Sequence, residues 1–362
     1  MEELAIEKLT NTTNFQTLFD DAPTTYVHQL ISDEMSWYVM KILMFGVTPT
    51  ISLFGVIGNI FSLHILTKHG LHKCSNILLV SLAFSDIMFL ISFNSVPKIL
   101  YEAVWNHEYR ELTELDAQVL FVLFSLFTLL DYTFGVTGLT LPLLITIERL
   151  LVIFFPLKFR QIVTPRRTWL AVVGLSAYCL STFVYTSLCT ELFYRPGHNG
   201  SSSKAILQKS NYFYANIDTV AYMEYLIVYT NVVIPPVLTS LGCVVISIKI
   251  KLRSIKRRQM TSKAVSGTRT TKMLLSVCCV YLVTAAILSV PHYIPQYGSY
   301  SLTEETPSNL GKVLYQLVNT AVCVNSSSNF IVYIVLNKNF RNTFVDLCKS
   351  WVGKTWGGGV IR

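Results

Sequence analysis

The chain has 362 residues, of which 52% are hydrophobic and only 14% are charged. A soluble domain carries about 25% charged residues, so this composition excludes an ordinary water-soluble protein. The formal net charge of +8 would suit a nucleic-acid-binding protein, but the basic residues are confined to particular loops, which argues against that class.

Seven apolar stretches are each long enough to cross a bilayer. A membrane-spanning helix needs about 20 mostly apolar residues, and no charged residue lies between Lys41 and Lys68. The six stretches that follow cover residues 76–100, 117–155, 169–192, 225–248, 273–297 and 313–336. The sequence therefore predicts an all-α membrane protein, a seven-transmembrane helix bundle with the two chain ends on opposite sides of the membrane.

The tails divide the chain into three parts. Residues 1–38 are expected to form a polar, acidic tail, residues 39–337 the bundle, and residues 338–362 a short amphipathic helix with a terminal tail. Phe340, Phe344 and Leu347 recur at i, i+4 and i+7 beside basic residues, which favours an eighth helix lying on the inner leaflet. A disordered tail is the alternative. Cys348 is a predicted lipid attachment site, with a plain buried cysteine as the alternative.

The loop charges indicate the orientation in the membrane. Of the 29 basic residues, 21 fall on one side of the predicted spans, whereas 17 of the 21 acidic residues fall on the other. The positive-inside rule then predicts a multi-pass plasma-membrane protein with an extracellular N-terminus and a cytoplasmic C-terminus. The sequons at Asn11 and Asn199 both fall outside in this arrangement and are predicted glycosylation sites.

The cysteines and the catalytic motifs indicate what the chain lacks. Of the eight cysteines, five lie in predicted spans and Cys74 and Cys348 are cytoplasmic, which leaves Cys189 alone near the outer surface. We therefore expect no disulfide. We find no His, Asp or Glu group with metal-ligand spacing and no nucleophile motif, so we expect no metal site and no enzyme activity.

Two acidic residues lie deep within predicted spans, where an ionisable group is costly and is a functional hypothesis by default. Asp131 lies 18 residues before Arg149, which is five helical turns, so both residues share one face about 27 Å apart. Asp131 could be a ligand counter-ion, or a hydrogen-bonded acid that holds helices together. Asp86 could hold a cation, or form a static polar link with the neighbouring asparagines.

The motifs of the spans resemble those of the rhodopsin-like G-protein-coupled receptors over residues 55–344. They are Gly58-Asn59 in the first span, Leu82-Ala83-Phe84-Ser85-Asp86 in the second, Glu148-Arg149-Leu150 with Pro156-Leu157 after the third, Trp169 in the fourth, Pro235 or Pro236 in the fifth, Pro291 in the sixth and Asn329-Phe330-Ile331-Val332-Tyr333 in the seventh. Each motif is weak alone, but their order and spacing together are specific.

The departures from that family are equally informative. Ser289 and Ala285 stand where the sixth span usually has Trp and Phe, and Phe330 replaces the proline of the seventh span. The family's outer disulfide has no counterpart, and Thr271 lies where an acid can pair with the third-span Arg. The resemblance is therefore to a divergent, invertebrate-type peptide or chemosensory receptor.

The resemblance implies four groups of functional residues. Ligand contacts are expected at Asp131, His292, Gln296 and Asn319, and G-protein coupling at Glu148, Arg149, Pro156 and Leu157. A polar core that could hold sodium, the one cofactor considered, is expected at Asn59, Asp86, Asn325 and Asn329. The activation switch is expected at Pro291, Ser289 and Tyr333.

The ligand class is predicted from charge and from missing residues. The acidic outer loops would steer a cation towards the bundle, but the fifth span has Ile227, Val228 and Asn231 instead of the serines that bind a small amine, and Cys323 replaces a Tyr. We favour a basic or amidated neuropeptide, with a small-amine or other chemosensory receptor as the alternative.

A transporter or channel is the alternative from another class, although no internal repeat is evident. The expected partners are this ligand, a heterotrimeric G protein and the bilayer, and no nucleic acid.

Overall fold

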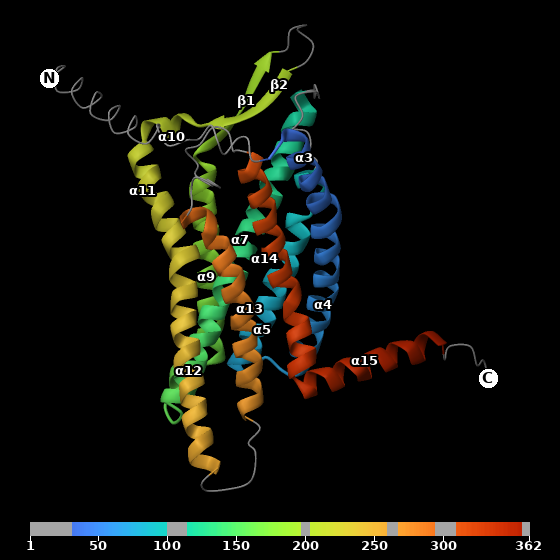
Figure 1. The fold of residues 1–362 in the computed structure, drawn as a ribbon, viewed down its shortest axis with the longest axis vertical. Coiled ribbons are helices and arrows are strands. Elements are labelled where there is room, and N and C mark those ends of the chain that lie inside the picture. The colour runs from blue at the N-terminus through green and yellow to red at the C-terminus, as the bar shows by residue number, and fades with distance from the viewer. Residues whose placement is uncertain (1–30, 100–113, 197–202, 259–266, 294–308, 357–362) are drawn as a thin grey trace, which may run out of the picture.

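The structure is a computed structural model, and it describes residues 31–99, 114–196, 203–258, 267–293 and 309–356. In this part of the chain the helices stand side by side as an elongated bundle (Figure 1). A β-hairpin lies above one end of the bundle, and the last helix leaves the other end sideways. We call the hairpin end the outer end and the other the inner end, after the orientation predicted from the loop charges.

Among the described residues, seven long helical segments form the bundle. The first three are α3 (Asp33–Lys41) continued by the π-helical turn η1 (Ile42–Val47) and α4 (Thr48–Lys68), then α5 (Cys74–Phe93) and α7 (Glu114–Phe154). The fourth is α9 (Pro165–Ser187), and the fifth is α11 (Ile217–Val228), the π-helical turn η2 (Tyr229–Val233) and α12 (Ile234–Arg258). The sixth and seventh are α13 (Gly267–Tyr293) and α14 (Asn309–Leu336).

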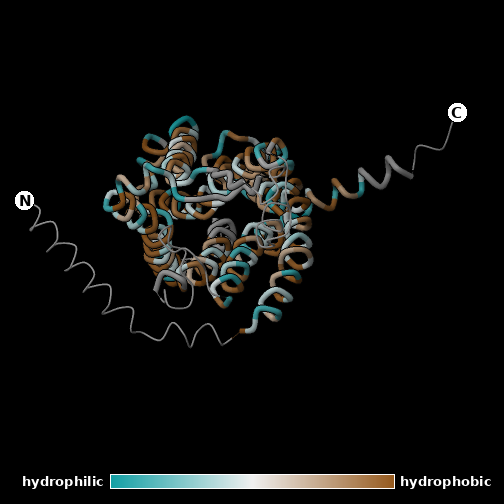
Figure 2. The backbone as a smooth tube through the Cα atoms, turned by 90° about the horizontal axis from the view of Figure 1, so that it is seen from above, coloured by the Kyte–Doolittle hydropathy of each residue, from teal (hydrophilic) through white to brown (hydrophobic). Residues whose placement is uncertain are grey.

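This architecture confirms the predicted seven-helix membrane bundle. Six of the segments are long and apolar enough to cross a membrane, and α13 contains a shorter apolar stretch, Leu275–Val290. Apolar residues recur along the helices of the bundle (Figure 2), and many of the large ones are exposed. Leu53, Phe54 and Leu170, for example, are 61–71% exposed, which water would disfavour and lipid tolerates.

The first helix begins earlier than expected, inside the tail predicted for residues 1–38. The Ser32 hydroxyl accepts a hydrogen bond from the backbone N–H of Met35 at 3.3 Å, which caps the helix. Asp33 and Glu34 place negative charge in the first turn, where the helix dipole favours it.

Between the fourth and fifth helices, where the sequence predicts only the gap between the spans 169–192 and 225–248, the structure has a β-hairpin. Helix α9 ends at Ser187 rather than near residue 192. Strands β1 (Thr190–Pro196) and β2 (Ser203–Lys209) then pair antiparallel, with Thr190 opposite Lys209. The short helix α10 (Asn211–Ala215) and the start of α11 follow.

The base of the hairpin is tied to the bundle by packing and by backbone hydrogen bonds. Cys189, Phe213 and Val220 form a small buried cluster. The Ser210 N–H donates to the Cys189 carbonyl at 3.0 Å, and the Ser210 hydroxyl donates to the Leu188 carbonyl at 2.6 Å. All eight cysteines are free thiols, so this attachment is noncovalent.

Helices α4 and α14 approach closely because α4 carries glycines at the crossing. A Cβ atom added to Gly55 would lie 2.1 Å from the Ser327 hydroxyl oxygen, and one added to Gly58 would lie 2.9 Å from the Phe330 Cβ. The Ser327 hydroxyl donates instead to the Ile51 carbonyl at 3.1 Å. The glycines therefore position the first helix against the polar face of the seventh.

The last helix, α15 (Lys338–Trp356), is joined to the bundle by aromatic rings. Phe344 packs edge-on against Phe61 of α4 and against Phe330 of α14, with ring centroids 5.2 and 5.4 Å apart, and Phe340 packs against Phe330 at 6.1 Å. We call these four residues the inner aromatic cluster. Helix α15 takes up most of the predicted segment of residues 338–362 and extends away from the bundle (Figure 1).

Candidate functional site

Asp131 lies in the outer half of α7, and its carboxylate is paired with the Lys98 ammonium. Both side chains are buried, with 8% of Lys98 and 9% of Asp131 exposed. Lys98 lies in the helical residues 96–99 that follow α5, and its ammonium also lies 4.4 Å from the centre of the Phe93 ring. The predicted counter-ion therefore already has a cationic partner within the chain.

Sequence reasoning missed Lys98, although a signal was present. The second span was predicted to reach residue 100, so Lys98 was an ionisable residue within a predicted span, and such residues are functional candidates by default. The structure brings this lysine against the acid of the third helix.

A small cavity lies on the far side of Lys98, between α4, the outer end of the second helix and α14. Its volume of about 10 Å³ suits a single water molecule. Thr48, Asn94 and Gln316 contribute polar side chains to its wall. The Thr48 hydroxyl lies 2.9 Å from the Thr320 hydroxyl and 3.5 Å from the Gln316 amide nitrogen, so this wall is hydrogen-bonded across α4 and α14.

The other predicted ligand contacts are only partly placed by the structure. Asn319 lies on α14, and its side-chain amide nitrogen is buried without a hydrogen-bond partner among the described residues. His292 and Pro291 belong to the end of α13, but the structure does not describe their side chains, and Gln296 lies outside the described residues. Asn231 has two such unpartnered atoms; it lies in the π-helical turn η2, a distortion often found at functional sites.

The predicted polar core forms around Asp86, which is only 1% exposed. The Asn329 amide donates to its carboxylate at 2.8 Å, and the Ser326 hydroxyl also bonds to it. The Asn59 amide donates to the Ser326 carbonyl at 2.8 Å, so helices α4, α5 and α14 meet here. Asn325 is buried on the same helix as Asn329.

The residues of this core fit a small hard cation. The side-chain amide oxygen of Asn59 is buried without a hydrogen-bond partner among the described residues, and Asp86 supplies a carboxylate. Oxygen atoms of these kinds are the ligands that hard cations prefer. A Cβ added to Gly138 would lie 3.4 Å from one oxygen of Asp86, so position 138 of α7 directly faces this carboxylate.

The inner end of α7 carries a second ion pair. The Arg149 Nε lies 2.8 Å from the Glu148 Oε2. Ser75, at the start of α5, donates its hydroxyl to the Glu148 Oε1 at 3.0 Å and accepts a hydrogen bond from the Arg149 guanidinium. The predicted coupling residues Glu148 and Arg149 are therefore held against the second helix, while Leu157, in the loop beyond, is 93% exposed.

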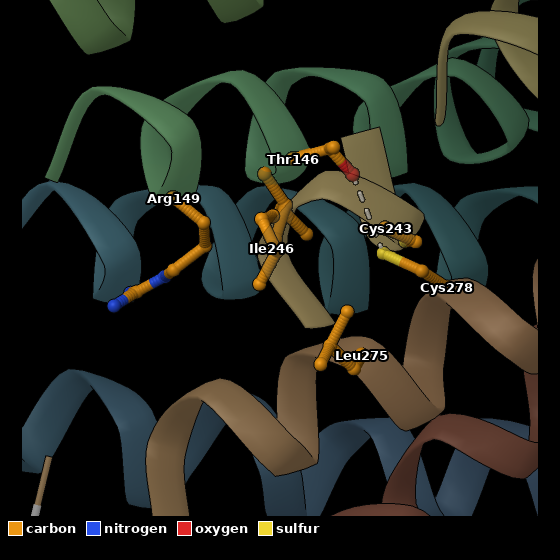
Figure 3. A pocket seen from close by; sticks show the side chains of 7 residues that line it. Thr146, Arg149, Cys243, Ile246, Leu275 and Cys278 are labelled. Atoms are coloured by element: carbon orange, nitrogen blue, oxygen red, sulfur yellow. Dashed lines mark hydrogen bonds between the residues drawn. The ribbon is translucent and has the colours of Figure 1, made fainter. Parts of the chain in front are cut away.

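A small cavity lies next to Arg149, between the inner ends of three helices (Figure 3). Its walls come from α7, α12 and α13: Ile145, Thr146, Arg149, Cys243, Ile246, Leu275 and Cys278. The Thr146 hydroxyl and the Cys278 sulfur lie 3.5 Å apart. Arg149 extends away from these sulfur atoms in Figure 3.

Of the predicted switch residues, Ser289 lines a groove and Tyr333 is buried. Ala285 and Ser289 line a groove of about 400 Å³ between α12 and α13, at the positions where the resembling family has Phe and Trp. The Ser289 hydroxyl donates back to the Ala285 carbonyl at 2.7 Å and so contacts no neighbouring helix through a hydrogen bond of its own. Tyr333 is buried on α14, and its hydroxyl has no hydrogen-bond partner among the described residues.

The predicted modification sites are mostly outside the structure. Asn11 and Asn199 lie outside the described residues. Cys348 lies half-buried on α15. These three predictions stay predictions.

Comparison with known proteins supports one family. A family model described as serpentine type 7TM GPCR chemoreceptor Srw matches residues 46–351. The chain is 21% identical over 311 residues to a protein named FMRFamide receptor from Drosophila melanogaster, and the match covers 82% of this chain but 52%, about half, of the fly protein. It is 22% identical over 307 residues to a probable G-protein coupled receptor from Caenorhabditis elegans, a match that covers 83% of this chain and 68% of the worm protein.

Proposed function

Because the chain belongs to the Srw family of serpentine seven-transmembrane G-protein-coupled chemoreceptors, we propose that it transmits the binding of an extracellular ligand to a heterotrimeric G protein. It is a receptor of the cell surface with several membrane spans. Its N-terminus is outside the cell and its C-terminus is cytoplasmic in this proposal, which rests on the distribution of the basic residues.

The observation that carries the proposal is that α7 takes part in two buried ion pairs, one near each of its ends. Asp131 and Arg149 both lie on α7, and each is held by a group from the second helix or its outer extension, Lys98 at the outer end and Ser75 at the inner end. A ligand that changes the outer contact therefore acts on the same helix pair that holds the inner one. Activation requires only that the ligand bind the open arrangement more tightly than the closed one.

Ligand binding is proposed among the third, fifth, sixth and seventh helices. Asp131 supplies charge, and the side-chain amide of Asn231 and the amide nitrogen of Asn319, which have no hydrogen-bond partner among the described residues, supply hydrogen bonds. A buried polar group without a partner costs free energy, so a ligand that bonds to it recovers that cost. His292 and Gln296 are the further proposed contacts.

We propose a peptide as the ligand, either basic or amidated. The similarity to a protein named FMRFamide receptor supports this class, and so does the excess of acidic residues in the predicted outer loops. The serines expected for a small amine are replaced by Ile227, Val228 and Asn231, which argues against a small amine.

At the inner side, Glu148, Arg149, Pro156 and Leu157 are the proposed contacts with the G protein. The exposed Leu157 offers an apolar anchor for a partner. Asp86 and Asn59 would hold a sodium ion, which would supply a positive charge that stabilises the closed core. Ser289, Pro291 and Tyr333 are the proposed switch, and Asn11, Asn199 and Cys348 the proposed modification sites.

A signalling screen tests this function. Cells expressing the chain, with verified surface labelling, are exposed to a library of basic and amidated peptides and to small amines, and calcium and cyclic nucleotide are recorded. A peptide response that disappears in cells lacking the relevant G protein is expected. Substrate flux through purified chain in liposomes, without any G protein, would instead establish a transporter or channel.

A further inference from the structure

Two buried thiols meet at the inner cavity, one from α12 and one from α13. Cys243 is 8% exposed and Cys278 is 2% exposed, and the two side chains interact with each other. The Thr146 hydroxyl of α7 lies 3.5 Å from the Cys278 sulfur and also bonds to Cys243. Figure 3 shows both cysteines at one side of the cavity, away from Arg149. The proposed ligand and G-protein contacts do not use these thiols.

The surroundings of the pair favour reaction at one of the two sulfurs. The thiolate is the reactive form of cysteine, and a neighbouring hydrogen-bond donor stabilises it. Cys243 has two such neighbours, the Cys278 thiol and the Thr146 hydroxyl. Cys278 is then the thiol that lies close enough to complete a disulfide with it, which is how dithiol pairs in proteins are oxidised and reduced.

The cavity gives a small oxidant a place beside the sulfurs. Its volume of about 10 Å³ is that of a water-sized molecule, and hydrogen peroxide is only slightly larger. A disulfide requires the two sulfurs to approach to about 2 Å, and the cavity leaves the side chains room to turn. The cavity lies at the predicted cytoplasmic end, where thiols are kept reduced and a disulfide is usually transient.

We propose that Cys243 and Cys278 are a site of reversible oxidation, where a peroxide converts the two thiols into a disulfide that joins α12 to α13. The Cys243 sulfur attacks one oxygen of hydrogen peroxide, the O–O bond breaks, and a sulfenic acid and a water form. The Cys278 sulfur then attacks the Cys243 sulfur, the S–O bond breaks, and a second water leaves. The thiols lose two electrons and two protons, which reduce one peroxide to two waters. A cellular thiol such as glutathione restores the pair by exchange.

The disulfide would also limit how the inner ends of the helices move. The cavity lies between α7, α12 and α13, and a covalent bond between α12 and α13 fixes their separation beside it. Oxidation therefore lowers the population of any state in which these two helices part. This effect on signalling rests on the proposed function, whereas the formation of the disulfide does not.

Peptide mapping of the purified full chain tests the site. The receptor is treated with hydrogen peroxide in detergent, remaining thiols are alkylated, and its peptides are analysed by mass spectrometry with and without a reductant. The expected product is a pair of peptides joined through Cys243 and Cys278, two hydrogens lighter than the reduced pair and separated by the reductant. The oxidised receptor should also melt several degrees higher, because the new bond restricts the unfolded chain.

Three variants locate the bond. Cys279→Ser is the matched control, because Cys279 is the next residue of α13 but is exposed, and it should keep the joined peptides. Cys278→Ser and Cys243→Ala each remove one partner and should lose both the joined peptides and the rise in melting temperature. The mapping of the unmodified chain decides the question even where a variant fails to fold.

The outcomes separate this inference from the proposed function. The site is overturned if both thiols can still be alkylated after peroxide, if one of them gives only a sulfinic acid, or if the disulfide joins Cys279 instead. Basal G-protein activation that stays the same after complete disulfide formation would overturn the effect on signalling. A disulfide in a chain that activates no G protein in either redox state would leave the site standing and overturn the proposed signalling role.

Discussion

At the scale of single residues, Asp86 shows how an acid can remain in the middle of a bundle. Among the described residues it is the most deeply buried acid, and the amide of Asn329 is bonded to it. Removing that amide leaves the carboxylate with fewer partners, and a lost bond to a buried charged group costs about 1–3 kcal/mol.

We therefore expect Asn329→Ala to lower the melting temperature of the purified receptor by several degrees, the range for about 1–3 kcal/mol. Asn339→Ala removes an exposed asparagine of α15. Its free energy of unfolding should stay within about 0.5 kcal/mol of that of the unmodified receptor, as for most surface changes. Indistinguishable melting of the two variants would show that the hydrogen bond to Asp86 contributes nothing.

The inner ion pair predicts the effect of one neutral substitution. Glu148→Gln keeps a group that can bond to Ser75 but removes the charge that holds Arg149. If the pair stabilises the closed state by about 1.4 kcal/mol, its loss raises the open population about tenfold. Basal G-protein activation, measured without ligand at matched surface expression, should rise, whereas Glu34→Gln at an exposed outer position should not change it. A fall in basal activity would contradict this role.

Residue patterns revealed most of the charged positions but not how they are paired. Asp86, Asp131 and Arg149 were identified because a charge within an apolar span is costly wherever it occurs. The partner of Asp131 was not identified, because Lys98 lies on a different helix. Only the crossing of the second and third helices brings Lys98 and Asp131 together. The position of the Asn231 side chain depends on the π-helical turn η2, and this turn has no clear sequence signature.

At the scale of elements, the crossing of α4 and α14 is set by two small residues. Gly55→Val would place atoms within 2.1 Å of the Ser327 hydroxyl, so the helices must separate, and overpacking of this kind costs about 1–3 kcal/mol. We expect lower surface expression and a lower melting temperature. Gly174→Val on α9, where nothing lies within 4 Å of the added Cβ, is the control. Equal stability of both variants would mean that the crossing is not tightly packed.

The inner aromatic cluster predicts how α15 is attached. Phe344 makes two of its ring contacts, each worth about 0.5–1.5 kcal/mol. Phe344→Ala should therefore raise hydrogen exchange of the α15 backbone about tenfold, the change expected for about 1.4 kcal/mol of local stability. Val345→Ala, on the exposed side of the same helix, should leave the exchange unchanged. Protection that persists in Phe344→Ala would show that α15 is held by other contacts.

Helices were more predictable than the segments that connect them. Apolar length identifies a span because a bilayer has a fixed thickness, and the spans matched within a turn or two at most ends. The hairpin of β1 and β2 was missed because its strands lack a regular alternation of apolar and polar residues. The sequence Pro196-Gly197 is typical of a turn, but a turn alone does not predict paired strands.

At the scale of the whole molecule, the charge distribution predicts which side each end occupies. An epitope tag at the N-terminus should be labelled on intact cells, and one at the C-terminus only after permeabilisation. The 21 basic residues on the predicted inner side give the reason. A glycosidase should reduce the apparent mass of the receptor, and Asn11→Gln/Asn199→Gln should abolish that reduction. Labelling of both tags on intact cells would refute the seven-span topology.

The noncovalent base of the hairpin has a further consequence for the outer surface. Burial, followed by the neighbouring Glu224, raises the pKa of the Cys189 thiol, so this sulfur stays protonated and reacts slowly. Dithiothreitol should then leave the hairpin in place. Cooling should loosen it, because the packing of Cys189, Phe213 and Val220 weakens at low temperature. We therefore expect the position of the hairpin to depend on temperature but not on redox conditions.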